Sequence, residues 1–250
     1  MSRTAILRFA VIVGGIAVLE ALCLAGVIDK ITMQPPHLIV RDLWRLLVSG
    51  RMNAAIVKTL ANTLLALGLA VGAGLIVAAL LHRRRAVRDT LDPLFATYYA
   101  VPVFAFYPFF IVVFGLGDLP QILIAFMLAV VAVIVNTLNG LDRVPRVYRK
   151  AARTQRLGMA QTAWRITLPF AWPYVLTGAK LAVAYALIGI IASEFLMGRD
   201  GMGYEIAFAY NNFDNARMYP LIILVLIVAM TINGLLFNWE RVLLARRGLK

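Results

Sequence analysis

Cysteine and histidine are almost absent from this chain. Its 250 residues include one cysteine, Cys23, and two histidines, His37 and His82. A single cysteine cannot form a disulfide within the chain, and the two histidines do not have the spacing of metal ligands. The sequence therefore excludes an intramolecular disulfide framework and argues against redox chemistry or a metal site.

Carboxylates are also scarce. The chain has 12 Asp and Glu residues against 25 Lys and Arg, and no carboxylate occurs from Arg143 through Ser193. It also lacks a GxxxxGK[ST] loop, the pattern whose backbone amides hold the phosphates of ATP. We therefore expect that this chain cannot hydrolyse ATP alone and that it carries no catalytic residue, no metal and no cofactor of its own.

Hydrophobic residues are abundant, at 62% of the chain, and the mean hydropathy is +0.84. Six apolar runs are each long enough to cross about 30 Å of hydrocarbon as a helix. They are Ala5–Ile28, Ala54–Leu81, Leu91–Leu116, Leu119–Leu141, Trp172–Met197 and Met218–Leu244. The first is too long for the apolar core of a signal peptide, so it is read as a retained span. Because the runs are continuously apolar rather than alternating, the sequence predicts an all-α polytopic membrane protein with one domain over residues 1–250.

The third run contains Pro93, Pro102 and Pro108. Each proline removes a backbone donor, so this helix is expected to be kinked or broken and to face protein or a water-filled path. We therefore expect a gate near its aromatic residues, with ordinary packing as the alternative. The candidates for the pathway are Tyr98, Tyr99, Phe104, Asn136 and Glu194. For Asn136, hydrogen bonding between helices is the competing interpretation.

Lysine and arginine give the orientation. With a cytoplasmic N-terminus, the inner segments collect the clusters at 83–88, 143–165 and 241–250. The outer segments hold fewer basic residues, so the positive-inside rule places both termini in the cytoplasm. Most of the formal charge of +13 is then a topology signal, and no nucleic-acid interface is expected.

Two outer segments are not simple loops. In Asp29–Asn53, a Pro-Pro pair precedes a short amphipathic helix that is expected to lie on the membrane surface, with Leu38, Leu43, Leu46 and Leu47 on one side. In Gly198–Tyr219, two glycines precede another short helix. Together these segments are candidates for a surface that meets a soluble partner. Among single residues, Glu20 is expected to have a structural partner, and Lys180 to extend toward the nearby interface.

The basic segment after the fourth run predicts a cytoplasmic helix over residues 149–164. On such a helix, Leu157, Ala160 and Trp164 share one face. One interpretation is a helix that lies on anionic lipid, and the other is a docking element for a cytoplasmic protein. Small residues favour close approach by a partner. The residues expected to dock are Lys150, Ala151, Ala152, Arg153, Arg156, Leu157, Gly158, Ala160 and Trp164.

The same segment resembles the cytoplasmic signature of binding-protein-dependent ABC importer permeases. That signature reads Glu-Ala-Ala, three residues, Gly, nine residues, Ile, one residue and Leu-Pro, and this chain has Ala151-Ala152 and Ile166-Thr167-Leu168-Pro169 at the right distance. Lys150 stands in place of the Glu and Arg156 in place of the Gly. The segments PFFIVVFGLGDLPQI and LTGAKLAVAYALIGIIASEFLMGRDGMGYEI are similar to the nitrate, sulfonate and taurine branch of this family.

The resemblance implies a type I importer permease with six spans and a cytoplasmic coupling helix. Its implied partners are a second permease copy, two ATP-binding subunits that hold ATP and Mg, a periplasmic substrate-binding protein and the lipid of a bacterial inner membrane. It also implies a small anion as solute, such as a sulfonate, nitrate or an aromatic acid.

Three other functions compete with this interpretation. An ion-gradient-driven secondary transporter usually has inverted repeats and midplane carboxylates, but no repeat is visible and Glu20 stands alone in its run. An intramembrane enzyme needs a nucleophile with a base or a metal cluster, and neither histidine lies in a span. A lipid-handling scaffold is compatible with the basic helix alone.

Overall fold

The structure is a computed structural model that describes residues 3–29 and 32–246. Within these ranges the chain is helical, with no strand. The elements before the basic segment are α1 (Arg3–Leu24), α2 (Pro36–Val48), α3 (Asn53–Arg83), α4 (Arg85–Thr97), η1 (Tyr98–Ala100), η2 (Val103–Phe106), α5 (Tyr107–Phe114) and α6 (Asp118–Asp142). Those that follow are α7 (Arg146–Thr154), α8 (Met159–Thr162), η3 (Ala163–Thr167), α9 (Leu168–Met197), α10 (Met202–Asn211) and α11 (Asn215–Arg246).

The chain divides into two compact units. Unit 1 comprises the residues up to 58 together with 194–228, and unit 2 comprises 59–193 together with the residues from 229 on. The boundaries fall inside α3, α9 and α11. The two units are described separately below.

Five helical segments of the described chain, built on α1, α3, α6, α9 and α11, are long and apolar enough to cross a membrane. A sixth is obtained if Ala86–Ala100 and Val103–Phe114 form one span, since these two parts are bent by 87°. The break lies at Pro102, and Val101 before it is extended, with φ −76° and ψ 125°. The helical region of backbone dihedral angles is disfavoured for a residue that precedes proline. The expected break of the third run is therefore confirmed.

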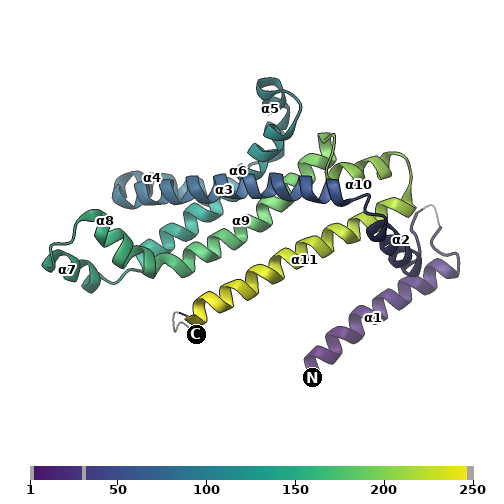
Figure 1. Cartoon of the computed structure of the whole chain (residues 1–250), viewed down its shortest axis with the longest axis horizontal. Coiled ribbons are helices and arrows are strands. Elements are labelled where there is room, and N and C mark those ends of the chain that lie inside the picture. The colour runs from purple at the N-terminus through teal and green to yellow at the C-terminus, as the bar shows by residue number, and fades with distance from the viewer. Residues whose placement is uncertain (1–2, 30–31, 247–250) are drawn as a thin grey trace. The chain divides into compact units, whose positions relative to one another are not determined.

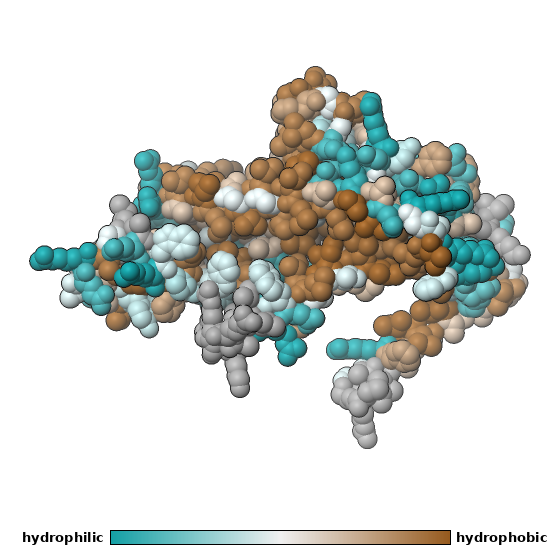
Figure 2. Space-filling model, viewed as in Figure 1, coloured by the Kyte–Doolittle hydropathy of each residue, from teal (hydrophilic) through white to brown (hydrophobic). Residues whose placement is uncertain are grey.

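The core of unit 2 lies where α3, α6 and α9 run side by side (Figure 1). Small side chains fill much of this contact, including Ala70, Ala129 and Ala186, each of which is fully buried. Small residues let membrane helices approach closely enough for their backbones to contribute van der Waals packing. Figure 2 shows hydrophobic residues along the visible surface of α3 and α5, whereas hydrophilic residues gather over α7.

Three glycines mark the contact between α6 and α9. A Cβ added at Gly189 would lie 2.7 Å from Cα of Ala125, and one added at Gly178 would lie 3.2 Å from the carbonyl oxygen of Ala132. At Gly140, the added atom would lie 3.0 Å from the carbonyl oxygen of Ala171. The two helices therefore touch backbone to backbone at three levels, and we call this contact the glycine seam.

In unit 1, α2 packs on a core that includes Met52, Ala209, Leu221 and Leu224. The inward row of α2 is Ile39 and Leu43, which are buried, with Leu46 partly buried beside them. Of the expected apolar face, Leu43 is buried and Leu38 and Leu46 are half-buried, but the prediction was wrong for Leu47, which is exposed. Leu38 and Leu47 lie on opposite sides of the buried row at 100° per residue.

Two charged residues that the sequence left single have partners. The Glu20 carboxylate pairs with the His37 ring and accepts the His37 backbone N–H at 3.1 Å, which confirms a structural partner for Glu20. Lys180 donates to the Glu240 carboxylate at 2.5 Å, beside the Phe237 ring. Lys180 therefore has a partner on α11, whereas its expected extension toward the interface stays a prediction.

Candidate functional site

The basic segment between α6 and α9 is the first candidate site. One continuous helix was expected over residues 149–164, but this prediction was wrong. The segment forms α7, a turn, the four-residue α8 and the π-helix η3 before α9 begins at Leu168. The shared face of Leu157, Ala160 and Trp164 that the continuous helix required therefore does not exist.

The turn after α7 explains the break. Arg156 has φ +49°, a left-handed conformation, and the Leu157 N–H donates to the carbonyl oxygen of Ala152 at 3.0 Å. Many helices end with a residue in the left-handed conformation, followed by a backbone hydrogen bond that closes a loop of six residues. Glycine is the preferred residue at the left-handed position. The signature resembled by this segment has its glycine at this position. The glycine of the signature thus corresponds to the end of a helix. The spacing of the apolar residues alone did not reveal this ending.

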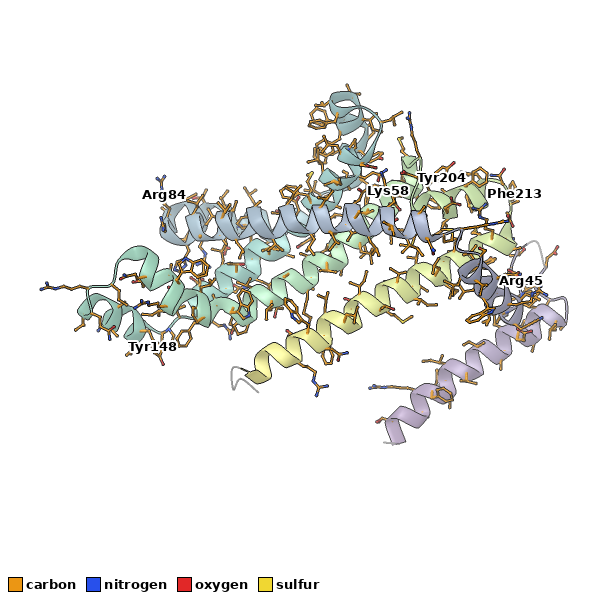
Figure 3. All side chains as sticks on the ribbon, in the orientation of Figure 1. Arg45, Lys58, Arg84, Tyr148, Tyr204 and Phe213 are labelled. Carbon is orange, nitrogen blue, oxygen red and sulfur yellow. The ribbon has the colours of Figure 1, made fainter. Side chains whose placement is uncertain are left out.

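Helix α7 packs on the rest of unit 2 through described side chains that include Tyr148. Ala152 is 3% exposed, and the ring of Tyr148, labelled in Figure 3, lies 4.6 Å from that of Phe170. Lys150 and Ala151 are exposed on α7, whereas Arg156 and Gly158 are exposed in the turn and Leu157 is half-buried. The side chains of Arg153 and Ala160 lie outside the described part of the structure. The segment therefore presents basic and small residues on its surface.

Trp164 lies on η3 and is 73% exposed. With Leu168, Pro169 and Trp172 it lines an open groove of about 290 Å³. The groove is apolar and adjoins a segment that has no carboxylate. It is a surface on which a protein side chain or a lipid chain can pack.

The start of the segment is fixed to neighbouring helices. The guanidinium of Arg143 lies 5.1 Å from the centre of the Tyr174 ring on α9. One residue earlier, the Asp142 carboxylate pairs with Arg88 at 2.5 Å and with the His82 ring at 3.4 Å. These contacts join the ends of α3, α4, α6 and α9.

The second candidate site is the break in the third apolar run. The Tyr98 hydroxyl donates to the carbonyl oxygen of Met127 at 2.9 Å. The Tyr99 ring contacts that of Tyr98 edge-on and stacks on the Tyr185 ring, with centres 5.4 Å apart. Tyr185 on α9 was missed by the sequence reasoning, because one aromatic residue on an apolar helix carries no signal of its own. The three tyrosines form an aromatic cluster at the bend.

The remaining candidates of unit 2, Phe104 and Asn136, make other contacts. Phe104 packs around Val103, Tyr107 and Ile124. Asn136 donates to the carbonyl oxygen of Ala132 on its own helix at 2.8 Å. A hydrogen bond to another helix was the competing interpretation for Asn136, and this bond instead satisfies its amide locally.

Glu194 lies in unit 1 and is 1% exposed. Its carboxylate accepts the Gly203 N–H at 2.9 Å, at the start of α10. A Cβ at Gly201 would collide with this carboxylate, and Gly201 has φ +98°. Glu194 therefore organises the turn between α9 and α10. Among the described residues, no group of three or more His, Cys, Asp and Glu is arranged to hold a metal ion.

Residues 70–248 match the model of a family described as binding-protein-dependent transport system inner membrane component. The chain belongs to this family. This family member is similar to the nitrate import permease protein NrtB of Leptolyngbya laminosa, with 32% identity over 147 residues that cover 59% of this chain and 53% of NrtB. It is also similar to the taurine transport system permease protein TauC of Escherichia coli K12, with 29% identity over 184 residues that cover 72% of this chain and 67% of TauC. The chain spans only 53 to 58% of the length of three nitrate import permease proteins.

A chain of the MetNI methionine ABC transporter, in an inward-facing conformation, has a similar fold. The TM-score is 0.64 at 21% identity, over 84% of this chain and 99% of that one. At this identity the likeness establishes the fold alone. The family and the apolar helices together identify a multi-pass inner membrane protein with an all-α, type I importer permease fold.

Proposed function

We propose that this chain is the transmembrane permease subunit of an ATP-driven importer. The observation that carries the proposal is the family match over residues 70–248, which includes the basic segment and the glycine seam. In the proposed assembly, two copies of this chain form the pathway. Two ATP-binding subunits hold ATP and Mg, and a periplasmic binding protein delivers the solute.

In this assembly the α7 segment is the coupling element. Ala151 and Lys150 are exposed on α7 and reachable by a partner. Closure of the ATP-binding subunits displaces the segment, and the contacts of Arg143 and Asp142 pass this displacement to α3, α4, α6 and α9. Rigid-body movement of the helices then opens and closes the pathway. This chain contributes movement and a passage, whereas ATP hydrolysis takes place on the partner.

The solute is proposed to be a small anion, such as nitrate, a sulfonate or an aromatic acid. The similarity to nitrate and taurine permeases supports this class. The proposed orientation has both termini in the cytoplasm, on the same side as α7. The aromatic cluster of Tyr98, Tyr99 and Tyr185 is the proposed gate, because it lies at a break where a helix cannot face lipid without unsatisfied backbone groups.

A substitution on α7 tests the coupling. Ala151→Trp places a large ring on an exposed position of α7, so it blocks a close partner without disturbing a core. We expect the ATP-binding subunit to co-purify with the unaltered chain and to be lost from the variant, together with ATP-driven uptake.

Ala86→Trp is the matched control, because Ala86 is an exposed alanine of α4 in the same unit. It should keep both the subunit and the uptake. If Ala151→Trp retains the subunit with full uptake, α7 is not the coupling element. If the unaltered chain purifies without any ATP-binding subunit and takes up solute on an ion gradient, the alternative of a secondary transporter is favoured.

A further inference from the structure

Helix α2 has an outward row of hydrophobic side chains besides the row that it buries. Val40, Trp44 and Val48 recur every four residues and are exposed, and Trp44 keeps 69% of its surface. Residues at this spacing lie on one face of a helix. The buried residues Ile39 and Leu43 lie on a different face, against the core of unit 1. α2 therefore needs an apolar environment on a second side.

A row of arginines borders this apolar row. Arg41 lies three residues before Trp44, and Arg45 lies three residues before Val48. Residues at this spacing are neighbours on a helix surface, so each arginine lies beside one apolar residue of the row. Figure 3 labels Arg45 on α2. The arginine side of α2 forms one wall of a groove of about 530 Å³, which Arg51 also lines. Across the groove lies the start of α11 with Arg217.

The carboxylates of the groove are already engaged. Asp42 pairs with Arg41 at 3.2 Å and with Arg45 at 3.6 Å, and it accepts a hydrogen bond from Gln34 at 2.6 Å. Asp214 accepts the Arg217 backbone N–H at 3.1 Å and so caps α11. Within the described part of the chain, no carboxylate pairs with Arg51. Two aspartates line the groove and Glu205 pairs with Arg217, so four arginines meet three carboxylates and the groove keeps an excess of positive charge.

Three kinds of occupant can be compared with these observations. A small inorganic anion matches the arginines but leaves the apolar row uncovered. An acidic protein segment also matches the arginines, but it matches the apolar row only if it carries an apolar patch beside its carboxylates. A helix with an apolar row containing Trp beside a basic row is typical of the membrane interface. An amphiphile with a negative head matches both rows in one molecule, and a membrane supplies it wherever α2 lies at the interface.

We propose that the groove between α2 and α11 binds the phosphate headgroup of an anionic phospholipid, whose acyl chains lie along Val40, Trp44 and Val48. Guanidinium groups suit this ligand because their planar donors can hold two phosphate oxygens at once. Arg217 is oriented by its pair with Glu205 on α10. The site does not depend on the transport function, since it requires only that α2 lie at the membrane surface.

Quenching of Trp44 by a lipid with brominated chains tests the site. The full-length chain in mild detergent is titrated with brominated phosphatidylglycerol, and the same titration of Trp44→Phe identifies the part of the signal that belongs to Trp44. We expect saturable quenching of Trp44 by this lipid. The double variant Arg45→Gln with Arg51→Gln should weaken binding by about 25-fold, at about fivefold for each arginine. Arg199→Gln is the matched control, since Arg199 is exposed outside the groove, and it should bind normally.

Three results would overturn the proposal. Brominated phosphatidylcholine that quenches Trp44 with equal affinity would mean that the headgroup is not recognised. Inorganic phosphate that displaces the lipid at the concentration of the lipid itself would assign the groove to a small anion. Unchanged lipid affinity in the double variant, with loss of a soluble partner protein, would assign the arginines to a protein surface. As a check without any substitution, added salt should weaken binding of phosphatidylglycerol and not of phosphatidylcholine.

Discussion

The glycine seam predicts a specific cost for one added methyl group. In Gly189→Ala the new Cβ would lie 2.7 Å from Cα of Ala125 and 3.0 Å from its Cβ. The nearest of these atoms belongs to backbone, so the helices themselves must shift. Overpacking of this kind costs about 1–3 kcal/mol. The substitution also gains up to about 1 kcal/mol of helix propensity, which partly hides the cost.

Gly72→Ala separates these two effects. Gly72 lies on α3 of the same unit, and an added Cβ there would meet nothing within 4 Å. Both variants gain the same propensity, so the difference between them measures the contact alone. In thermal unfolding of the two variants in one detergent, the midpoint temperature of Gly189→Ala should be the lower one, by about 2–4 °C for each kcal/mol of difference. A midpoint of Gly189→Ala at or above that of Gly72→Ala would refute the close approach of α6 and α9.

Substitutions at three further positions have expected outcomes. Arg156→Gly should raise the unfolding free energy by about 1 kcal/mol, because it removes a side chain from a left-handed residue, and an unchanged denaturant midpoint would contradict this. Glu194→Ala should destabilise unit 1 by about 2 kcal/mol, since it leaves the buried Gly203 N–H without its charged acceptor, whereas Glu194→Gln should cost less by the same measurement. The pKa of Asp42 is raised by partial burial and lowered by hydrogen bonds from Gln34 and Arg41 and by the charges of Arg41 and Arg45. The lowering effects are together the larger, so the pKa lies below its ordinary value of 3.8. The carboxylate therefore stabilises the fold above pH 3.8 and loses this contribution as the pH falls through the folded value. Asp42→Asn should flatten that part of the pH dependence of unfolding.

The sequence could predict the long apolar helices and the break at Pro102, because hydrophobic length and a missing N–H are local properties. It could not predict the ending of α7. An arginine at position 156 has no intrinsic preference for a left-handed conformation, and the basic and small residues on both sides of it fit a continuous helix. Only the aligned glycine of the family signature carried that information.

Contacts between residues distant in the sequence could not be predicted either. Lys180 and Glu240 are 60 residues apart, and nothing local shows that α9 and α11 bring them together. The stack of Tyr99 on Tyr185 has the same origin. The inward row of α2 was mistaken because leucines lie on several of its faces, and only the packing of unit 1 distinguishes the buried face from the exposed one.

The glycine seam also limits how α6 and α9 can move. Sliding one helix past the other by one turn, about 5.4 Å, would bring a side chain from three or four residues away to each of the three levels. At each level a backbone atom lies within 3.2 Å of the added Cβ, and backbone cannot move aside as the end of a side chain can. Within unit 2 the pair is therefore expected to move as one rigid body when residues 143–167, which join the two helices, are displaced. Bending is then expected in the helices around this pair, and first at the break beside Pro102.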